Sequence, residues 1–417
     1  MSYPTKANPW EQRKLGEMGS TYSGMSGKTK EDFGHGEAVY IPYLNIFQNT
    51  LSNLSMTDKV EIDDTQNKVE YGDILFTTSS ETPEEVGLSS VWLGNQENLY
   101  LNSFCFGYRL KEIIDLYFLG YALRSPYMRN QMKILAQGIS RYNISKNKVM
   151  DLQINIPCIK EQKYIGEIFL RIDSLITLHQ RKLEHLKLKK KSLLQKLFPR
   201  EGELYPELRF PGFTDPWEQR RLGEISTYLQ NNTLSRDELN YKVPNIQNIH
   251  YGDILIKFDE VVDGSSTDIP FINKFLDLSK YNKSLLRDGD VVLADTAEDG
   301  TVGKAIELQN VKPSHILAGL HTIPCRPLIA FGKGYLGNFF NSESYRLQLR
   351  PLIQGIKVSS ISKNLLKNTI VKYPQDLLEQ KQIGNVFYKI TMLITLHQRK
   401  LEHLQLLKKA LLQQLFV

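Results

Sequence analysis

The chain carries the same sequence landmarks twice, in the same order, about 210 residues apart. Pro9–Glu17 reads PWEQRKLGE, and Pro216–Glu224 reads PWEQRRLGE, an offset of 207 residues. The sequence LITLHQRKLEHL occurs without change at Leu175–Leu186 and at Leu393–Leu404, an offset of 218. A period of this length indicates a duplicated domain and not a stack of short repeats. The 417 residues are long enough for two or three domains with cores of their own.

Shorter pairs of landmarks lie between and after these two. They are Gln137–Ile139 with Gln354–Ile356, Ile144–Asn147 with Ile361–Asn364, and Leu193–Phe198 with Leu411–Phe416. The slow drift of the offset from 207 to 218 is what a few insertions in two otherwise parallel half-chains produce.

A turn that leads into a strand is predicted at Gly72-Asp73 and again at Gly289-Asp290, an offset of 217. Glycine supplies the open backbone angle, and the aliphatic residues that follow favour a sheet. Tyr251–Leu255 (YGDIL) is an alternative match for the first turn, but it does not keep the offset. Beyond this feature, residues 18–136 and 225–353 share little. This pattern predicts a common scaffold around two different readout surfaces.

Two long helices are predicted, one at the end of each half. Pro157 and Pro199 bracket 41 residues without proline, in which apolar residues recur at spacings of three and four. The second half repeats the pattern from Ile383 to Leu415. At 1.5 Å per residue each helix is roughly 55–60 Å long, about 16 base pairs of duplex at ~3.4 Å each. Because a parallel pair would crowd the two globular domains together, we expect an antiparallel coiled coil.

Two histidines occupy this predicted seam. His179 and His397 are interpreted as imidazoles tolerated within the helix packing, with a ligand or pH-switch role as the alternative. His179 and His185 are six residues apart, so they do not share a helix face as a pair of metal ligands would.

Composition excludes several classes of protein. No apolar run reaches the ~18 residues of a membrane span. The first residues, MSYPTKANPWEQRK, contain no apolar stretch of the secretory kind. The three cysteines (Cys105, Cys158 and Cys325) are isolated and suit neither a disulfide framework nor a metal site. We therefore expect a cytoplasmic globular protein that does not contact a membrane.

The positive charge lies on the predicted helices. The chain has 52 Lys and Arg against 46 Asp and Glu, a net charge of +6. Residues 160–198 hold 10 basic and 4 acidic residues, and residues 378–417 hold 6 and 2, so the helices carry +10. The remainder is −4, and any patch there that binds a polyanion must be local.

Together these features resemble the specificity subunit of type I restriction-modification systems, over essentially the whole chain. The resemblance is carried by Pro9–Glu17 and Pro216–Glu224, by Gly72–Gly87 and Asp288–Lys304, by Gln137–Asn147 and Gln354–Asn364, and by the two helices that end in LLQKLF and LLQQLF. It implies an α+β fold, with two duplicated α/β target recognition domains separated by two long helices that form an antiparallel coiled coil. The implied parts are a first recognition domain (1–157), a first helix (158–198), a linker (199–213), a second recognition domain (214–376) and a second helix (377–417).

The resemblance also implies a function for each part. Each recognition domain reads one half of a bipartite, asymmetric double-stranded DNA site. The helices set the unread spacer and dock two methyltransferase (modification) subunits and the restriction, or translocase, subunits. The chain itself is implied to be non-catalytic and to bind no cofactor. S-adenosylmethionine belongs to the methyltransferase subunits, and ATP and Mg²⁺ belong to the restriction subunits.

Polar residues of the repeated loops are the candidate DNA contacts. Gln and Arg can pair with adenine or guanine edges, Glu can accept from cytosine, and Lys, Ser and Thr suit phosphates or several bases. The candidates of the first half are Thr77, Ser79, Ser80, Gln137, Ser140, Arg141, Asn143 and Lys146, and those of the second half are Thr296, Glu298, Gln354, Lys357, Ser359, Ser360 and Lys363. The alternative for the Gln-Gly-Ile loops is a structural loop before a strand. Arg109 and the segment His321–Arg326 are weaker candidates.

Signs of catalysis are weak in this sequence. It has no Asn/Asp-Pro-Pro-Tyr/Phe motif for a flipped base and no phosphate-binding Gly-x4-Gly-Lys-Ser/Thr motif. Gly332–Gly337 fits G-x-G-x-x-G, but it follows a proline-containing segment and is interpreted as a loop that enters a helix. Asp295–Asp299 is interpreted as a polar loop and not as a metal site. A stand-alone bipartite DNA-binding regulator remains the main alternative, and a self-contained methyltransferase or nuclease is a second one.

Overall fold

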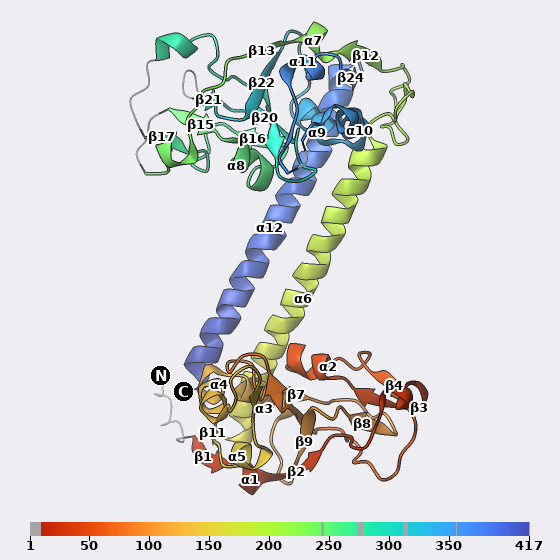
Figure 1. Ribbon diagram of the computed structural model, residues 1–417, viewed down its shortest axis with the longest axis vertical. Helices are drawn as coiled ribbons and strands as arrows, with labels where there is room; N and C mark the ends of the chain where they lie inside the picture. Colours follow the sequence, from red (N-terminus) through yellow and green to blue (C-terminus); the bar gives the residue numbers. More distant parts are fainter. Residues whose placement is uncertain (1–9, 243–245, 274–277, 312–315, 356, 417) are drawn as a thin grey trace, which may run out of the picture. The chain divides into compact units, whose positions relative to one another are not determined.

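The computed structural model of this protein forms two compact units (Figure 1). It describes residues 10–242, 246–273, 278–311, 316–355 and 357–416. The first unit contains Met1–Gln180 together with Arg399–Val417, and the second contains Arg181–Gln398. Each unit therefore combines one globular domain with the end of the long helix that belongs to the other half of the sequence.

The first unit is built on two small sheets. A four-stranded antiparallel sheet has the order β2-β9-β5-β7, and a three-stranded sheet has the order β4-β3-β8, in which β3 and β8 are parallel. The elements are β1 (Glu11–Lys14), α1 (Leu15–Met18), β2 (Gly19–Ser23), β3 (Phe33–Ile41), α2 (Tyr43–Gln48), β4 (Asp58–Val60), β5 (Ile74–Thr77), β6 (Ser79–Ser80), β7 (Ser89–Val91), β8 (Leu99–Leu101), β9 (Cys105–Leu110), α3 (Leu116–Leu123), α4 (Pro126–Leu135), β10 (Tyr142–Asn143), α5 (Lys146–Met150), β11 (Gln153–Ile156) and α6 (Ile159–Lys196).

The second unit repeats this plan. Its larger sheet has the order β13-β22-β18-β20-β16, so its first four strands match those of the first unit. Its smaller sheet has the order β14-β17-β15-β21. The elements are β12 (Glu218–Arg221), α7 (Leu222–Ile225), β13 (Ser226–Tyr228), β14 (Leu239–Asn240), β15 (Gln247–Ile249), α8 (Tyr251–Ile256), β16 (Val261–Asp263), β17 (Phe271–Ile272), β18 (Val291–Ala294), β19 (Thr296–Ala297), β20 (Ala305–Gln309), β21 (Ile316–Ala318), β22 (Thr322–Pro327), α9 (Tyr335–Asn341), α10 (Glu343–Leu349), β23 (Ser359–Ser360), α11 (Lys363–Leu366), β24 (Ile370–Tyr373) and α12 (Leu377–Leu415).

The repeated Gly-Asp turn leads into the central strand of each larger sheet. Gly72 and Gly289 have φ angles of 88° and 82°, which a side chain rarely adopts. The buried Asp73 receives two hydrogen bonds from Arg109, from Nε at 2.9 Å and from Nη2 at 2.8 Å. The structure confirms the pairing of these turns, because Tyr251–Ile256 forms a helix instead.

The second unit repeats this ion pair. Arg326 donates to Asp290 from Nε at 3.0 Å and from Nη2 at 2.7 Å. Two-point ion pairs of this kind fix the arginine side chains within the sheet. Arg109 and Arg326, two of the weaker DNA-contact candidates, are therefore used by the scaffold.

The two predicted long helices are present as α6 and α12, and their ends pair in antiparallel fashion within each unit. In the first unit, Phe169 of α6 stacks on Phe416, and Asp173, one turn later, binds Lys408 at 2.6 Å. A later residue of α6 thus contacts an earlier residue of α12, which shows that the two helix ends are antiparallel. His179 and His397 lie within these helices, and the side chain or backbone of each takes part in at least one contact with another group.

A phenylalanine at each helix end anchors it in the core of the other half's domain. In the first unit, Phe416 lies 6.3 Å from Trp10 and 5.5 Å from Phe118, measured between ring centroids. In the second unit, Phe198 lies 6.3 Å from Trp217 and 5.8 Å from Tyr335. In each unit, therefore, the tryptophan of the repeated PWEQR segment lies against the phenylalanine of the repeated LLQ(K/Q)LF segment.

The scaffold shared by the two units extends further than the sequence analysis predicted. The expectation that residues 18–136 and 225–353 share little else was wrong for one stretch, which reads S-x-x-x-R-x-Q in both halves. It comprises Ser125, Arg129 and Gln131 in the first half and Ser342, Arg346 and Gln348 in the second.

These residues make the same contacts in both units. Ser125 and Ser342 cap α4 and α10. Gln131 donates to the Gln153 carbonyl oxygen at 3.1 Å, and Gln348 donates to that of Ile370 at 3.0 Å. Because single side chains bind backbone groups here, the residues between them are free to vary, and little of the similarity appears in the sequence.

Candidate DNA-recognition site

The structure brings together two groups of predicted DNA contacts in each unit. In the first unit the Gln-Gly-Ile loop closes as a hairpin. The Gln137 amide donates to the Asn143 carbonyl oxygen at 3.0 Å, and the Asn143 amide donates back to Gln137 at 2.8 Å. The outgoing strand β10 then pairs with β6, with Tyr142 opposite Ser80 and Asn143 opposite Ser79. The loop and the strand end thus form one continuous surface feature.

The second unit repeats this arrangement with different side chains. The Gln354 amide donates to the Ser360 carbonyl oxygen at 2.9 Å, and the Ser360 amide donates back at 2.7 Å. Strand β23 pairs with β19, with Thr296 opposite Ser360. We name residues 137–143 and 354–360 the reading hairpins. Ile356, within the second, lies outside the described residues.

Glycine is required at the second position of each reading hairpin. Gly138 has a φ angle of 143° and Gly355 one of 109°. A Cβ atom at Gly138 would overlap the carbonyl oxygen of Arg141, and one at Gly355 would overlap that of Val358. The repeated Gln-Gly therefore fixes the backbone, and the residues after it are free to differ.

Most predicted contacts on the reading hairpins are open to a ligand. In the first unit, Gln137, Ser140, Arg141 and Asn143 are exposed. Arg141 lies over the ring of Phe104, 5.7 Å from its centroid. The half-buried Lys146 donates from Nζ to Ser23 Oγ at 3.0 Å.

The second hairpin is similarly accessible. Gln354, Lys357 and Ser360 are exposed, and Ser359 and Lys363 are half-buried.

The predicted contacts on β5, β6 and β19 are less accessible. Thr77, Ser79 and Ser80 are all buried, and Thr77 donates to the Leu88 carbonyl oxygen at 3.4 Å. Ser80 donates to Glu85 at 3.2 Å. In the second unit, Thr296 is half-buried and Glu298 is exposed. The serines of β6 therefore support the hairpin, whereas the exposed polar groups lie mainly on the hairpin itself.

Beside the two hairpins lie two equivalent residues, one in each unit, that the sequence did not identify as a pair. Phe104 and His321 are 217 residues apart, the offset of the nearby landmarks. The Phe104 carbonyl oxygen accepts from the Thr78 amide at 2.9 Å, and that of His321 accepts from the Asp295 amide at 3.0 Å. His321 lay at the edge of a weaker candidate segment, and a search at constant offset would have paired it with Phe104.

A half-buried arginine holds the loop that follows β6 in the first unit and β19 in the second. Arg129 donates to the carbonyl oxygens of Glu84, Val86 and Gly87 at 2.5–3.0 Å. Arg346 donates to those of Gly300 and Val302, both at 2.6 Å. Burial lowers the pKa of Arg129 to about 10 and also lowers the pKa of Arg346. The positively charged groups are retained because each satisfies several backbone acceptors.

The G-x-G-x-x-G segment enters helix α9, as the sequence analysis expected, and its amides bind a side chain of the protein. Glu307 of β20 accepts from the Gly334 amide at 2.7 Å and from the Gly337 amide at 3.0 Å. Burial raises the pKa of Glu307, although these hydrogen bonds oppose the rise. Its carboxylate occupies the place where a phosphate would have to sit.

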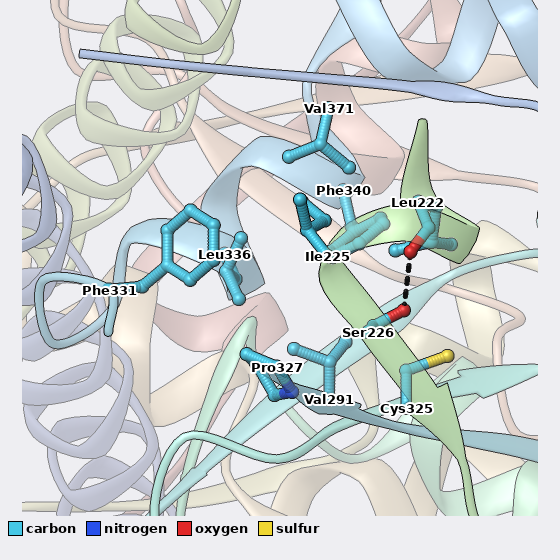
Figure 2. Close-up of a pocket in the computed structure, with 10 residues that line it drawn as sticks. All are labelled: Leu222, Ile225, Ser226, Val291, Cys325, Pro327, Phe331, Leu336, Phe340 and Val371. Carbon is cyan, nitrogen blue, oxygen red and sulfur yellow. Dashed lines mark hydrogen bonds between the residues drawn. The ribbon is translucent and has the colours of Figure 1, made fainter. Parts of the chain in front are cut away.

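Other kinds of site receive no support from the described residues. No group of three or more His, Cys, Asp or Glu residues among them could hold a metal ion, Asp295–Asp299 included. None of the helices in the described ranges is long and apolar enough to cross a membrane. Figure 2 shows a pocket in the second unit whose lining is apolar except for Ser226, and this hydroxyl donates to the Leu222 carbonyl oxygen at 2.7 Å. Such a pocket is a gap in a core, since it lacks convergent polar groups.

Comparison with known proteins agrees with the duplicated fold. Residues 7–188 match the family model of the type I restriction modification DNA specificity domain. The type I restriction enzyme MjaVIII specificity subunit of Methanocaldococcus jannaschii is 25% identical over 308 residues, 72% of this chain and 68% of that protein. The putative MjaX specificity subunit of the same organism is 23% identical over 419 residues, 97% and 92% of the two chains.

Solved structures have the same fold. The S subunit of a type I restriction-modification system from M. genitalium has a TM-score of 0.55 and 15% identity, and the match covers 100% of this chain and 98% of that one. A chain from a structure of type I restriction-modification complex assembly has a TM-score of 0.54 and 17% identity, with 98% of both chains covered. The fold is that of a type I specificity subunit. The match to the type I restriction modification DNA specificity domain lies in the first half of the chain, and the second half repeats the same strand order in the larger sheet.

Proposed function

We propose that this chain is the non-catalytic DNA-recognition subunit of a type I restriction-modification complex. In this role each unit reads one half of a bipartite, asymmetric DNA site through its reading hairpin and the adjoining loops. The observation that carries the proposal is the repeated hairpin, with the same backbone in both units and different exposed side chains. Arg141 and Asn143 stand on one hairpin, and Lys357 and Ser360 stand on the other.

The chemistry of these groups suits duplex DNA. Arg141 can donate two parallel hydrogen bonds to the O6 and N7 atoms of guanine, and Gln137 or Asn143 can pair with adenine. Lys146, Lys357 and Lys363 can neutralise phosphates and fix the register of the protein on the duplex. Since the net charge outside the helices is −4, these local cations carry the attraction to DNA in the globular domains.

The long helices are the proposed spacer and docking surface. Each of α6 and α12 has 38 or 39 residues, about 57 Å of helix at 1.5 Å per residue. Leu175, Leu188 and Leu406 are exposed along them, with 43%, 67% and 67% of their surface accessible. We infer that two methyltransferase subunits cover these apolar positions and that restriction subunits join the complex through them. S-adenosylmethionine, ATP and Mg²⁺ are bound by those partners in this proposal.

Mapping of methylated adenines tests the proposal. The chain is expressed with its modification subunits in a host that lacks other adenine methyltransferases. We expect methylation at one split, asymmetric sequence with a fixed spacer, and the same sequence should be protected from the complete nuclease. The isolated chain should show no binding of S-adenosylmethionine. Binding to a split sequence without any partner-dependent methylation would favour a stand-alone regulator.

A further inference from the structure

We propose that Phe104 in the first unit and His321 in the second determine which base each unit prefers at one position of its half-site. The inference rests on the proposed function and deepens it. It names one position, the same in both units, where the recognition chemistry differs.

The backbone places the two residues equivalently. Phe104 precedes β9 and His321 precedes β22, and the carbonyl oxygen of each receives the amide hydrogen of the residue just before β6 or β19. Each side chain is therefore carried beside the strand end that pairs with its reading hairpin. His321 adopts a φ angle of 56°, in the left-handed region where histidine, asparagine and aspartate are enriched among residues other than glycine.

In the first unit the position presents an aromatic face to solvent. Phe104 is 54% exposed, and Arg141 of the reading hairpin lies over its ring. The ring restricts the guanidinium through a cation–π contact. The pair thus offers a planar donor beside an apolar edge, which suits guanine next to the methyl group of thymine.

In the second unit the same position presents an imidazole. His321 Nδ1 lies 3.3 Å from Asp295 Oδ1 and 3.4 Å from Thr296 Oγ1. Tyr251 meets the imidazole edge-on with the ring centroids 5.3 Å apart, and His250 is the next titratable group on that side, near Arg236 and Asp253. When Nδ1 donates to Asp295, the imidazole presents Nε2 as an acceptor. An acceptor suits the amino group of adenine or cytosine.

Reciprocal substitutions test this inference in the complex with modification subunits. Phe104→His should change base preference in the half-site of the first unit only, and His321→Phe in that of the second only. We expect a change of about tenfold in preference at one base pair, the effect of one good base contact. His321→Asn provides a second variant, because asparagine tolerates the left-handed backbone and preserves folding. It should change the same half-site.

Ile113→Ala and Leu328→Ala are the matched controls, since both residues are exposed, at 93% and 63%, away from the hairpins. Both controls should leave both half-sites unchanged. If the wild-type complex recognises no split sequence, the proposed function fails. If it recognises one and the His321 and Phe104 variants retain its preferences, or change both halves together, the inference is overturned.

Discussion

Phe198 of the first half of the chain stacks on Phe387 of the second, with ring centroids 6.1 Å apart and ring planes 9° apart. Phe416 and Phe169 make the equivalent contact in the other unit, at 5.7 Å and 24°. Each globular domain is therefore completed by the helix end that the other half of the sequence supplies. The two halves of the duplicated sequence thus exchange their helix ends, each of which packs in the domain of the other half.

Truncation of either anchoring ring should destabilise one unit. Phe198→Ala should lower the free energy of unfolding of the second unit by about 3–5 kcal/mol, the usual cost of removing a buried phenylalanine. Phe416→Ala should act on the first unit in the same way. Denaturant unfolding, followed by hydrogen exchange in each unit, measures both effects. Leu188→Ala, at a position 67% exposed, should change stability by less than about 0.5 kcal/mol. Equal effects of all three variants would contradict the anchoring role.

Substitution of Arg129 or Arg346 should loosen the loop that follows β6 or β19. Arg129→Met removes the donor of three carbonyl oxygens. Glu84 is exposed, whereas Val86 and Gly87 are buried, and each of their carbonyl oxygens that water cannot reach costs about 1–3 kcal/mol. Hydrogen exchange should quicken in residues 81–88, and discrimination should weaken in the first half-site alone. Arg346→Met should do the same for residues 298–303 and the second half-site. Arg171→Met, at a residue exposed on α6, is the control and should leave both loops protected.

The stability contribution of Glu307 should depend on pH with a definite sign. Burial raises its pKa in the folded protein, so the folded state binds a proton more tightly than the unfolded state does. The contribution is therefore largest below the ordinary glutamate pKa of about 4.3 and falls as pH rises above it. Glu307→Gln removes this titration. Denaturant unfolding of both proteins over a pH series should give a stability difference that shifts in favour of the variant as pH rises. A difference that is constant with pH would contradict the raised pKa.

Shortening of the helices tests their role as a spacer. Removal of Leu178–Glu184 from α6 and of the identical Leu396–Glu402 from α12 takes about two turns from each helix and keeps both anchoring ends. We expect a shorter spacer in the methylated sequence, with both half-sites unchanged. Removal from α6 alone mismatches the two helices and should abolish binding. An unchanged spacer in the double deletion would contradict the proposal that the helices set the spacer length.

The exposed cations of the two hairpins should act on separate half-sites. Arg141→Ala should relax base preference in one half by about 1–3 kcal/mol, the typical value of a two-point base contact. Gln137→Ala should affect the same half. Lys357→Ala should affect only the other. Methylated-adenine mapping with each variant measures this directly. Loss of preference in both halves after one substitution would argue against modular readout.

Much of the scaffold could be predicted because its signals are periodic or repeated. The apolar spacing predicted α6 and α12, and the offset of 217 correctly paired the turn at Gly72 with that at Gly289. The interpretation of Gly332–Gly337 as a loop that enters a helix is confirmed by α9. The DNA contacts remain predictions, since residue type indicates which bases a side chain can bind but not whether the side chain faces them.

The sequence by itself determined the duplication, the long helices and the glycines that fix the hairpin backbones, because these depend on local geometry and on spacing along the chain. Only the tertiary structure decided which distant groups meet. In the tertiary structure β6 pairs with the first reading hairpin, and Arg109 and Arg326 form ion pairs within the sheets. Glu307 accepts hydrogen bonds from the amides of Gly334 and Gly337, and Arg141 lies over the ring of Phe104. These contacts join residues 27 to 64 positions apart. They arise when buried polar groups must find partners, and no local pattern specifies which partner is in reach.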